Sequence, residues 1–297
     1  MLDKRDIYKW CCVPKESLVN HPDLRIPLRI VPDGKTLGEE MALDFIEEII
    51  RANEKSAQFN AIVPCGPNEW YKPFVQIVKE RRVSLKNMRV FHMDEMLDWE
   101  GKPLHPQDPS NFRSFMDKNF YGPIDDELAV LTENRLYLNA ENYVQIAQLI
   151  AETEIDYTLG GIGQDGHLAF NQARRNPYQY VTLDEMRNST ARLQENNFDT
   201  LIALSQRAFG TAWQFQPAMS LTLGAKECMK AKKVRIYSAT GAWKQTALRI
   251  ALFSEPTPEY PATLLSEHPD ARVTVTEETA RHPFAENPQW CFRGVNA

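Results

Sequence analysis

Hydrophobic positions along the chain follow two alternating patterns. Short runs of apolar, often β-branched residues recur between longer segments in which apolar residues return every three or four positions. Runs that are apolar almost throughout are typical of strands buried on both faces of a sheet. Such runs lie at residues 25–31, 59–64, 88–93, 155–161, 218–224, 234–239 and 271–276.

The segments between these runs have helical spacing. In 36–55, TLGEEMALDFIEEIIRANEK, apolar residues at 41, 42, 45 and 49 fall on one helical face. We expect Thr36 to cap this helix, with Glu39 three positions later. The same spacing predicts helices within 69–83, 141–154 and 241–254, although Pro73 disturbs the first of these.

Alternation of strands and helices predicts an α/β fold. We expect a mostly parallel, Rossmann-like sheet with helices on both faces and right-handed crossovers. No linker composition is visible, so residues 25–297 are predicted to form one domain, preceded by an extension at 1–24. In such sheets, ligands bind beyond the carboxyl ends of the strands.

Composition excludes several classes of function. The net charge of −6 argues against nucleic acid as a partner, because phosphate backbones need a basic surface. No stretch reaches the ~20 apolar residues that a membrane helix requires. The five cysteines (11, 12, 65, 228 and 291) have no zinc-site spacing, so no metal is expected, and free thiols fit a reducing, cytoplasmic compartment.

Two of the predicted strand ends carry groups suited to binding and proton transfer. The loop PCGPN contains Cys65, Gly66, Pro67 and Asn68, and backbone N–H groups at the following helix would suit a phosphate, although a plain turn explains the same residues. Asp94 follows the 88–93 run, where a carboxylate can take a proton from carbon beside a carbonyl. A helix cap or surface turn is the alternative for Asp94.

Two further strand ends complete the set. GGIGQDGH places Asp165 and His167 after a buried strand, so that the carboxylate can orient a histidine that moves protons near neutral pH. Lys244 is expected in the first turn of a helix, where it can contact a phosphate or simply face solvent. A base, a proton shuttle and an anion site at one sheet edge predict proton transfer on a phosphorylated sugar.

Two motifs in the right order resemble the glucosamine-6-phosphate deaminase (isomerase) family. MDE at 93–95, followed by HPQDPSNFRSFMDKNFYGPID, is similar to the family's MDEY and SYHSFMxxNFF segments. GGIGQDGHLAFN is similar to GxGxDGHIAFNE, and SLTLGAKE to the family's ALTVG segment. The likeness covers roughly residues 35–280. 6-Phosphogluconolactonases share the Gly-rich DGH turn but not the AFN continuation.

The resemblance implies a fold like that of ribose-5-phosphate isomerase and CoA-transferases, and it implies a mechanism. His167, supported by Asp165, would open the sugar ring, and Asp94 would move a proton between C2 and C1, giving fructose 6-phosphate and ammonia without a cofactor. Phosphate contacts would come from the 64–68 loop, Lys244 and Arg192. The resemblance also implies a homo-oligomer.

Three departures from the family pattern fall at the predicted site. The family has glutamate where this chain has Gln172, and an amide can hold the histidine ring by a hydrogen bond but cannot carry charge. The phosphate loop TGGTP becomes PCGPN, and MDEY becomes MDEM. With Asp94, Asp165 and His167 retained, these changes favour an altered substrate choice or slower ring opening.

Three functions therefore stay open at the sequence level. The first is an amino-sugar-phosphate deaminase. The second is a related enzyme, either a sugar-phosphate isomerase that releases no ammonia or a 6-phosphogluconolactonase-like hydrolase. The third is a catalytically weak protein that binds sugar phosphates. Ammonia release separates the first from the others, and binding without turnover identifies the third.

Overall fold

A seven-stranded sheet forms the centre of the protein, and every pair of neighbouring strands in it runs parallel. The computed structural model describes residues 2–174 and 178–295. The mostly parallel α/β fold predicted from the sequence is confirmed. In spatial order the strands are β1 (Leu28–Val31), β10 (Ala271–Thr276), β9 (Lys233–Ser238), β6 (Tyr157–Gly160), β2 (Phe59–Val63), β3 (Met88–His92) and β5 (Arg135–Leu136).

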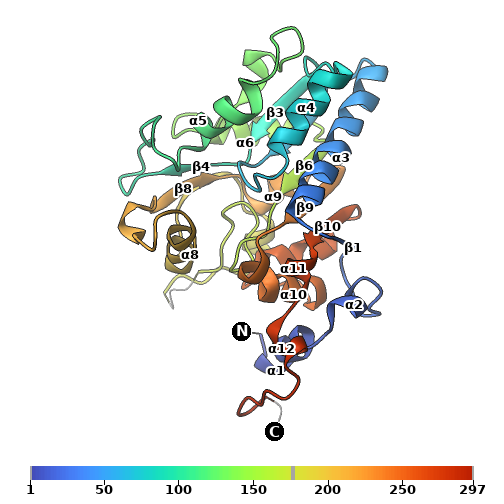
Figure 1. The fold of residues 1–297 in the computed structure, drawn as a ribbon. Helices are drawn as coiled ribbons and strands as arrows, with labels where there is room; N and C mark the ends of the chain where they lie inside the picture. The colour runs from blue at the N-terminus through green and yellow to red at the C-terminus, as the bar shows by residue number, and fades with distance from the viewer. Residues whose placement is uncertain (1, 175–177, 296–297) are drawn as a thin grey trace.

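Each face of this sheet has its own hydrophobic core, because successive strand residues point to opposite faces. In β2, Ala61 belongs to one core and its neighbour Ile62 to the other. Helices therefore cover both faces, as predicted (Figure 1). One core includes α3 (Gly34–Glu54) and α4 (Tyr71–Arg81), and the other includes α6 (Tyr143–Glu152) and α10 (Gln245–Phe253).

Helix α3 begins earlier than the sequence pattern predicts. Its N-cap is Asp33, whose side chain accepts a hydrogen bond from the backbone N–H of Thr36 at 2.8 Å. Thr36 was expected to be the cap, and this expectation is wrong. An aspartate is at least as good a cap as threonine, so the helix gains its first turn before the apolar pattern becomes visible.

A second, three-stranded antiparallel sheet lies beyond the carboxyl ends of the central strands. It consists of β4 (Asp94–Leu97), β8 (Met219–Thr222) and β7 (Arg192–Glu195), with β8 in the middle. The strand predicted within 218–224 is therefore present, but it is not part of the parallel sheet. Strand β4 follows β3 almost directly, so the Met93–Asp94 junction joins the two sheets.

The two ends of the chain lie side by side (Figure 1). Helix α1 (Lys4–Cys11) packs on α10 and on α12 (Pro283–Glu286), and the rings of Tyr8 and Phe284 are 5.4 Å apart. The remaining helices are α2 (Lys15–Leu18), α5 (Phe112–Met116), the π-helix η1 (Asp117–Tyr121), η2 (Thr132–Asn134), α7 (Leu183–Arg187), α8 (Phe198–Ala208), η3 (Trp213–Phe215), α9 (Ala225–Cys228), η4 (Gly241–Lys244), η5 (Pro261–Glu267) and α11 (Glu277–Ala280).

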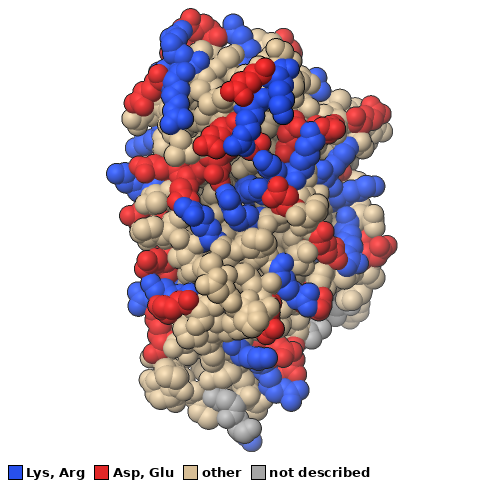
Figure 2. Space-filling model, turned by 90° about the vertical axis from the view of Figure 1, so that its right-hand side faces the viewer, with Lys and Arg blue, Asp and Glu red and all other residues tan. Residues whose placement is uncertain are grey.

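Charged side chains are mixed over the face shown in Figure 2. Basic and acidic groups alternate there instead of forming one basic area. This distribution agrees with the acidic net charge of the chain and offers no footprint for a phosphate backbone on that face. Among the described residues, no helix is both long enough and apolar enough to cross a membrane.

Candidate active site

A cavity of about 520 Å³ opens at the carboxyl ends of the central strands. It lies beyond the neighbouring strands β6 and β2, where the strand order reverses. From β2 the chain continues to β3 toward one edge of the sheet, and from β6 it continues to β9 toward the opposite edge. Such switch points are the usual ligand sites of open α/β sheets. The four strand ends singled out in the sequence all contribute lining residues, namely 64–69, 93–94, 161–164 with 167, and 237–240 with 244.

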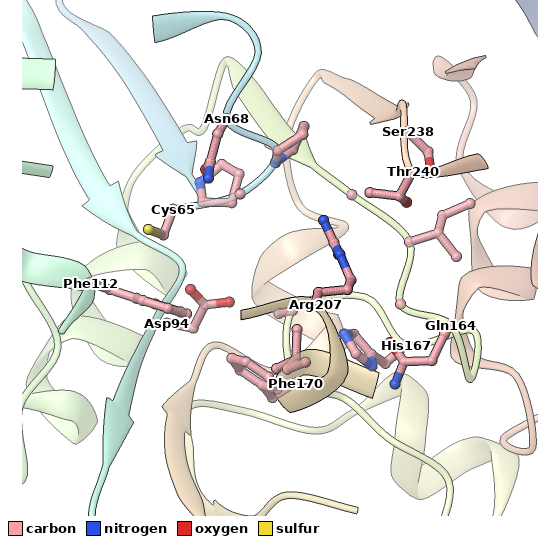
Figure 3. A pocket seen from close by; sticks show the side chains of 18 of the residues that line it. Cys65, Asn68, Asp94, Phe112, Gln164, His167, Phe170, Arg207, Ser238 and Thr240 are labelled. Atoms are coloured by element: carbon pink, nitrogen blue, oxygen red, sulfur yellow. The ribbon is translucent and has the colours of Figure 1, made fainter. Parts of the chain in front are cut away.

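Asp94 is the first residue of β4, two positions after β3 ends, and it lies between apolar side chains. Phe112 and Phe170 line the cavity on either side of it, and their rings are 6.4 Å apart (Figure 3). Burial, with a smaller contribution from the adjacent Glu95, raises the pKa of Asp94 to about 8. Glu95 itself turns away and accepts hydrogen bonds from the N–H groups of residues 112 and 113, which open α5. Of these two adjacent carboxyl groups, Asp94 is therefore the one that lines the cavity.

His167 faces the same cavity from a tight glycine turn after β6. A Cβ on Gly163 would lie 2.2 Å from the His167 ring, and Gly166 has φ +76°, so both positions require glycine. The Nδ1 atom of His167 lies 2.5 Å from Asp165 Oδ1. Because that nitrogen is occupied, Nε2 is left for a ligand.

Asp165 carries a negative charge in this pair. Burial alone would raise its pKa, but the His167 ring and backbone N–H groups outweigh burial and lower the pKa below its usual value. The carboxylate is 4% exposed and does not line the cavity. It supports the histidine from behind, as a group that orients the ring and balances an imidazolium charge.

Gln172 is buried behind the same pair, and its amide is hydrogen-bonded at both ends. Its Nε2 donates to Asp165 Oδ2 at 3.2 Å and to Thr200 Oγ1 at 2.6 Å, and Nε2 lies 3.3 Å from His167 Nδ1. Its Oε1 accepts from the backbone N–H of Asn197 at 2.9 Å. A flipped amide would face oxygen to carboxylate and N–H to N–H, so the partners fix the assignment.

Two cations lie close together at the other end of the cavity. Lys244 ends η4 and donates to the carbonyl of Ile162, and Arg207 reaches in from the last turn of α8 (Figure 3). Burial, and next the nearby Arg207 guanidinium, lower the pKa of Lys244 to about 8. Among the described residues, no carboxylate forms an ion pair with either cation. Two adjacent unpaired cations attract an anion.

Arg207 was not predicted, and Arg192 occupies a different place from the one expected. Arg192 lies in β7, does not line the cavity, and donates from Nη1 to the carbonyl of Thr190 at 3.3 Å. Burial lowers its pKa, and the next contribution comes from Arg174. Arg207 on α8 is therefore the arginine that is placed to contact a phosphate in the cavity.

The 64–68 loop lines the cavity opposite Arg207. Cys65, Gly66, Pro67 and Asn68 all contribute to its wall, and the Gly66–Pro67 peptide bond is cis. Two hydroxyl groups that the sequence did not single out face the same region from the end of β9. Ser238 Oγ and Thr240 Oγ1 are buried and, within the described part of the chain, have no hydrogen-bond partner, so they are available to a ligand.

His92, two residues before Asp94, has a packing role. Its ring stacks on Tyr137 with centroids 3.9 Å apart, and Nε2 lies 2.9 Å from the hydroxyl of Tyr121. Burial lowers its pKa to about 3, so the ring stays neutral. His92 does not line the cavity.

Known proteins similar to this chain carry one recurring name. No family model matches the chain. A glucosamine-6-phosphate deaminase from Parabacteroides distasonis is 30% identical over 260 residues, which cover 85% of this chain and 89% of the relative. One from Porphyromonas gingivalis is also 30% identical over 260 residues, covering 85% and 92%.

Solved structures place the fold in the same group. A monomeric glucosamine-6-phosphate deaminase superposes with a TM-score of 0.71 at 20% identity, covering 85% of this chain and 98% of the other. A 6-phosphogluconolactonase from Shewanella baltica superposes with a TM-score of 0.57 at 13% identity, covering 84% and 97%. Structures at this identity establish the fold, and the sequence relatives carry the family.

Proposed function

Because the chain belongs to the glucosamine-6-phosphate deaminase family, we propose that it converts glucosamine 6-phosphate and water to fructose 6-phosphate and ammonia. The observation that carries this proposal is the layout of one cavity. Asp94, with its raised pKa, and His167, supported from behind by Asp165, face its interior, and two cations that pair with no carboxylate of the described residues lie at its other end. That layout suits a sugar with a phosphate at one end and a proton transfer at the other.

The phosphate end is assigned to α8, η4 and two loops. Arg207 and Lys244 supply positive charge, and the hydroxyls of Ser238 and Thr240 supply donors. Arginine suits a phosphate because its planar fork donates two hydrogen bonds to two oxygens. Asn68 completes the wall from the 64–68 loop.

The reacting end is assigned to His167 and Asp94. His167, through Nε2, transfers the proton between the ring oxygen and the anomeric hydroxyl as the pyranose opens, and Asp165 stabilises the imidazolium. Asp94 then removes the proton from C2 and returns it to C1, while O1 gains a proton and the amine nitrogen loses one, so that the C1 aldehyde becomes a hydroxyl and the C2 amine becomes an imine. Hydrolysis of that imine releases ammonia and leaves the ketose. The apolar walls around Asp94 raise its pKa, so its carboxylate is a stronger base than that of an exposed aspartate.

Ammonia release from glucosamine 6-phosphate by the purified protein tests this proposal. Release at a rate that scales with enzyme, accompanied by fructose 6-phosphate, supports it. Asp94→Asn is the matched control because it removes the base and keeps the size of the side chain. A wild-type protein that releases no ammonia but hydrolyses 6-phosphogluconolactone would instead assign the lactonase activity of its structural relatives.

A further inference from the structure

Helix α8 connects the two ends of the proposed site. Thr200, Leu204 and Arg207 are spaced by four and three positions, so they lie on one face of the helix. Leu204 and Arg207 line the cavity, whereas Thr200 is 0% exposed and does not. Thr200 and Arg207 are two turns apart, roughly 10 Å along the axis. The position of Thr200 therefore sets where Arg207 lies.

Thr200 is hydrogen-bonded to the histidine end of the cavity. Its hydroxyl oxygen accepts from Nε2 of Gln172 at 2.6 Å and from Nε2 of Gln164 at 2.9 Å. Gln172 donates with its other N–H to Asp165, and Gln164 lines the cavity beside His167 (Figure 3). One hydroxyl thus joins α8 to both sides of the glycine turn.

A second hydrogen bond fixes the start of the same helix. The backbone N–H of Asn197, the N-cap of α8, donates to Oε1 of Gln172 at 2.9 Å, and the Asn197 side chain donates to the carbonyl of residue 173 at 2.7 Å. Gln172 therefore uses its donor and its acceptor on the same helix. A side chain that only accepts could keep the bond from Asn197 but could not donate to Thr200 or to Asp165.

We propose that Thr200 is a positioning residue that holds the phosphate-binding Arg207 at a fixed distance from the Asp165–His167 pair. The proposal rests on the function assigned above to these groups. Thr200 touches no substrate itself, and it acts through Gln172 at one end and through the helix at the other. Loss of its hydroxyl removes the acceptor from one N–H of the buried Gln172 amide and from the Gln164 amide at the cavity wall, which shifts the helix or the glycine turn.

The Thr200→Val variant tests this proposal because it removes the hydroxyl and nearly preserves the shape. Inorganic phosphate binding is measured by calorimetry, and kcat and KM are measured with glucosamine 6-phosphate. We expect phosphate binding to weaken roughly tenfold and kcat to fall by a similar factor. Thr200→Ser, which keeps the hydroxyl, is expected to stay close to the wild type.

Thr158→Val is the matched control. Thr158 is a buried threonine of β6 whose hydroxyl has no hydrogen-bond partner within the described part of the chain, so its loss should change neither phosphate binding nor kcat. If Thr200→Val does not fold, Thr200→Ala serves in its place. A variant that only melts at a lower temperature, with phosphate affinity unchanged, would show that Thr200 is structural and would overturn the proposal.

A double-mutant cycle with Arg207→Gln identifies the route of the effect. If Thr200 acts through Arg207, adding Thr200→Val to the Arg207→Gln background weakens phosphate binding no further. Full additivity would contradict the proposed connection. Phosphate binding can be measured without turnover, so the two proposals can fail separately. A wild-type protein that binds phosphate but releases no ammonia would contradict the deaminase function. The phosphate titrations of the variants would still decide the role of Thr200.

Discussion

Replacing Gln172 by glutamate, the residue that the family pattern has at this position, should destabilise the folded protein. In the wild type, Nε2 of Gln172 donates to Asp165 Oδ2 at 3.2 Å, while Oε1 is held by the N–H of Asn197. In Gln172→Glu, one oxygen keeps the bond to Asn197 and the other takes the place of the donor. Two carboxylates would then face each other in a buried site.

The size of the effect follows from that distance. Two unit charges 3.2 Å apart repel by roughly 5 kcal/mol at an effective dielectric constant of about 20. The repulsion raises the pKa of the introduced carboxyl in the folded protein above its value of ~4.3 in the unfolded chain. Above that pH the folded state keeps a proton that the unfolded chain has released. Stability is therefore lost as pH rises above about 4.

Thermal unfolding at about pH 5, pH 7 and pH 9 measures this loss. Relative to the wild type at each pH, the melting temperature of Gln172→Glu should fall by roughly 10 °C or more between the lowest and highest pH. Gln172→Met is the control, because it loses the hydrogen bonds that Gln172 donates, and also the bond from Asn197, without adding a charge. Its deficit should be the same at every pH.

Two results would refute the reasoning. One is a Gln172→Glu deficit that, like that of Gln172→Met, does not grow with pH. The other is a Gln172→Glu protein that releases ammonia faster than the wild type at about pH 9 and is equally stable there. Either would show that the site accommodates a second carboxylate beside Asp165 without repulsion.

The other predictions concern groups that face the cavity. Since burial raises the pKa of Asp94 to about 8, kcat/KM should rise with pH up to about 8 as the base loses its proton, and a rise centred near pH 4 in the pH profile would contradict this. Ionisation of Asp94 costs stability over the same interval, so Asp94→Asn should melt at a higher temperature at about pH 9, while kcat falls roughly 100-fold to 10,000-fold. Arg207→Gln should raise KM at least about tenfold in steady-state assays, whereas Arg192→Gln should leave it nearly unchanged. Lys244→Met should weaken phosphate binding in calorimetry, and because burial lowers the pKa of Lys244 to about 8, loss of this buried charge should raise the melting temperature near neutral pH.

The parts of the site that the sequence predicted are those that depend on local order. Asp94, His167 and Lys244 each follow a strand with a strong apolar pattern, and parallel strands end at one edge of the sheet. Their meeting in one cavity therefore follows from the strand assignment alone. The apolar runs carried this information because both faces of the sheet are covered, so nearly every position of these strands is buried.

Arg207 depends on long-range pairing that no local pattern reveals. It lies on α8, a helix that follows β7 in the small antiparallel sheet, and β7 and β4 are only four residues long with partly exposed side chains. Strands of that kind lack the continuous apolar run that marked the others. The run at 218–224 was visible, but its spacing cannot say whether a strand pairs with parallel or antiparallel neighbours. Unless that sheet is predicted, the position of α8 relative to the cavity cannot be predicted either. Arg192 therefore looked as suitable for a phosphate contact as Arg207.

The Gln172 amide also affects the separate roles of the two carboxyl groups, Asp94 and Asp165. Asp94 and Asp165 serve one cavity, yet burial raises the pKa of the first, and the histidine with backbone N–H groups lowers that of the second. Environments that separate two carboxyl groups in this way assign one to proton transfer and the other to charge stabilisation. A third carboxylate at position 172 would compete with Asp165 for the imidazolium. It would also repel the Asp165 carboxylate, since the side chain at 172 lies 3.2 Å from Asp165 Oδ2. The neutral amide instead stabilises the Asp165 charge by donating to it, so that a single buried anion balances His167.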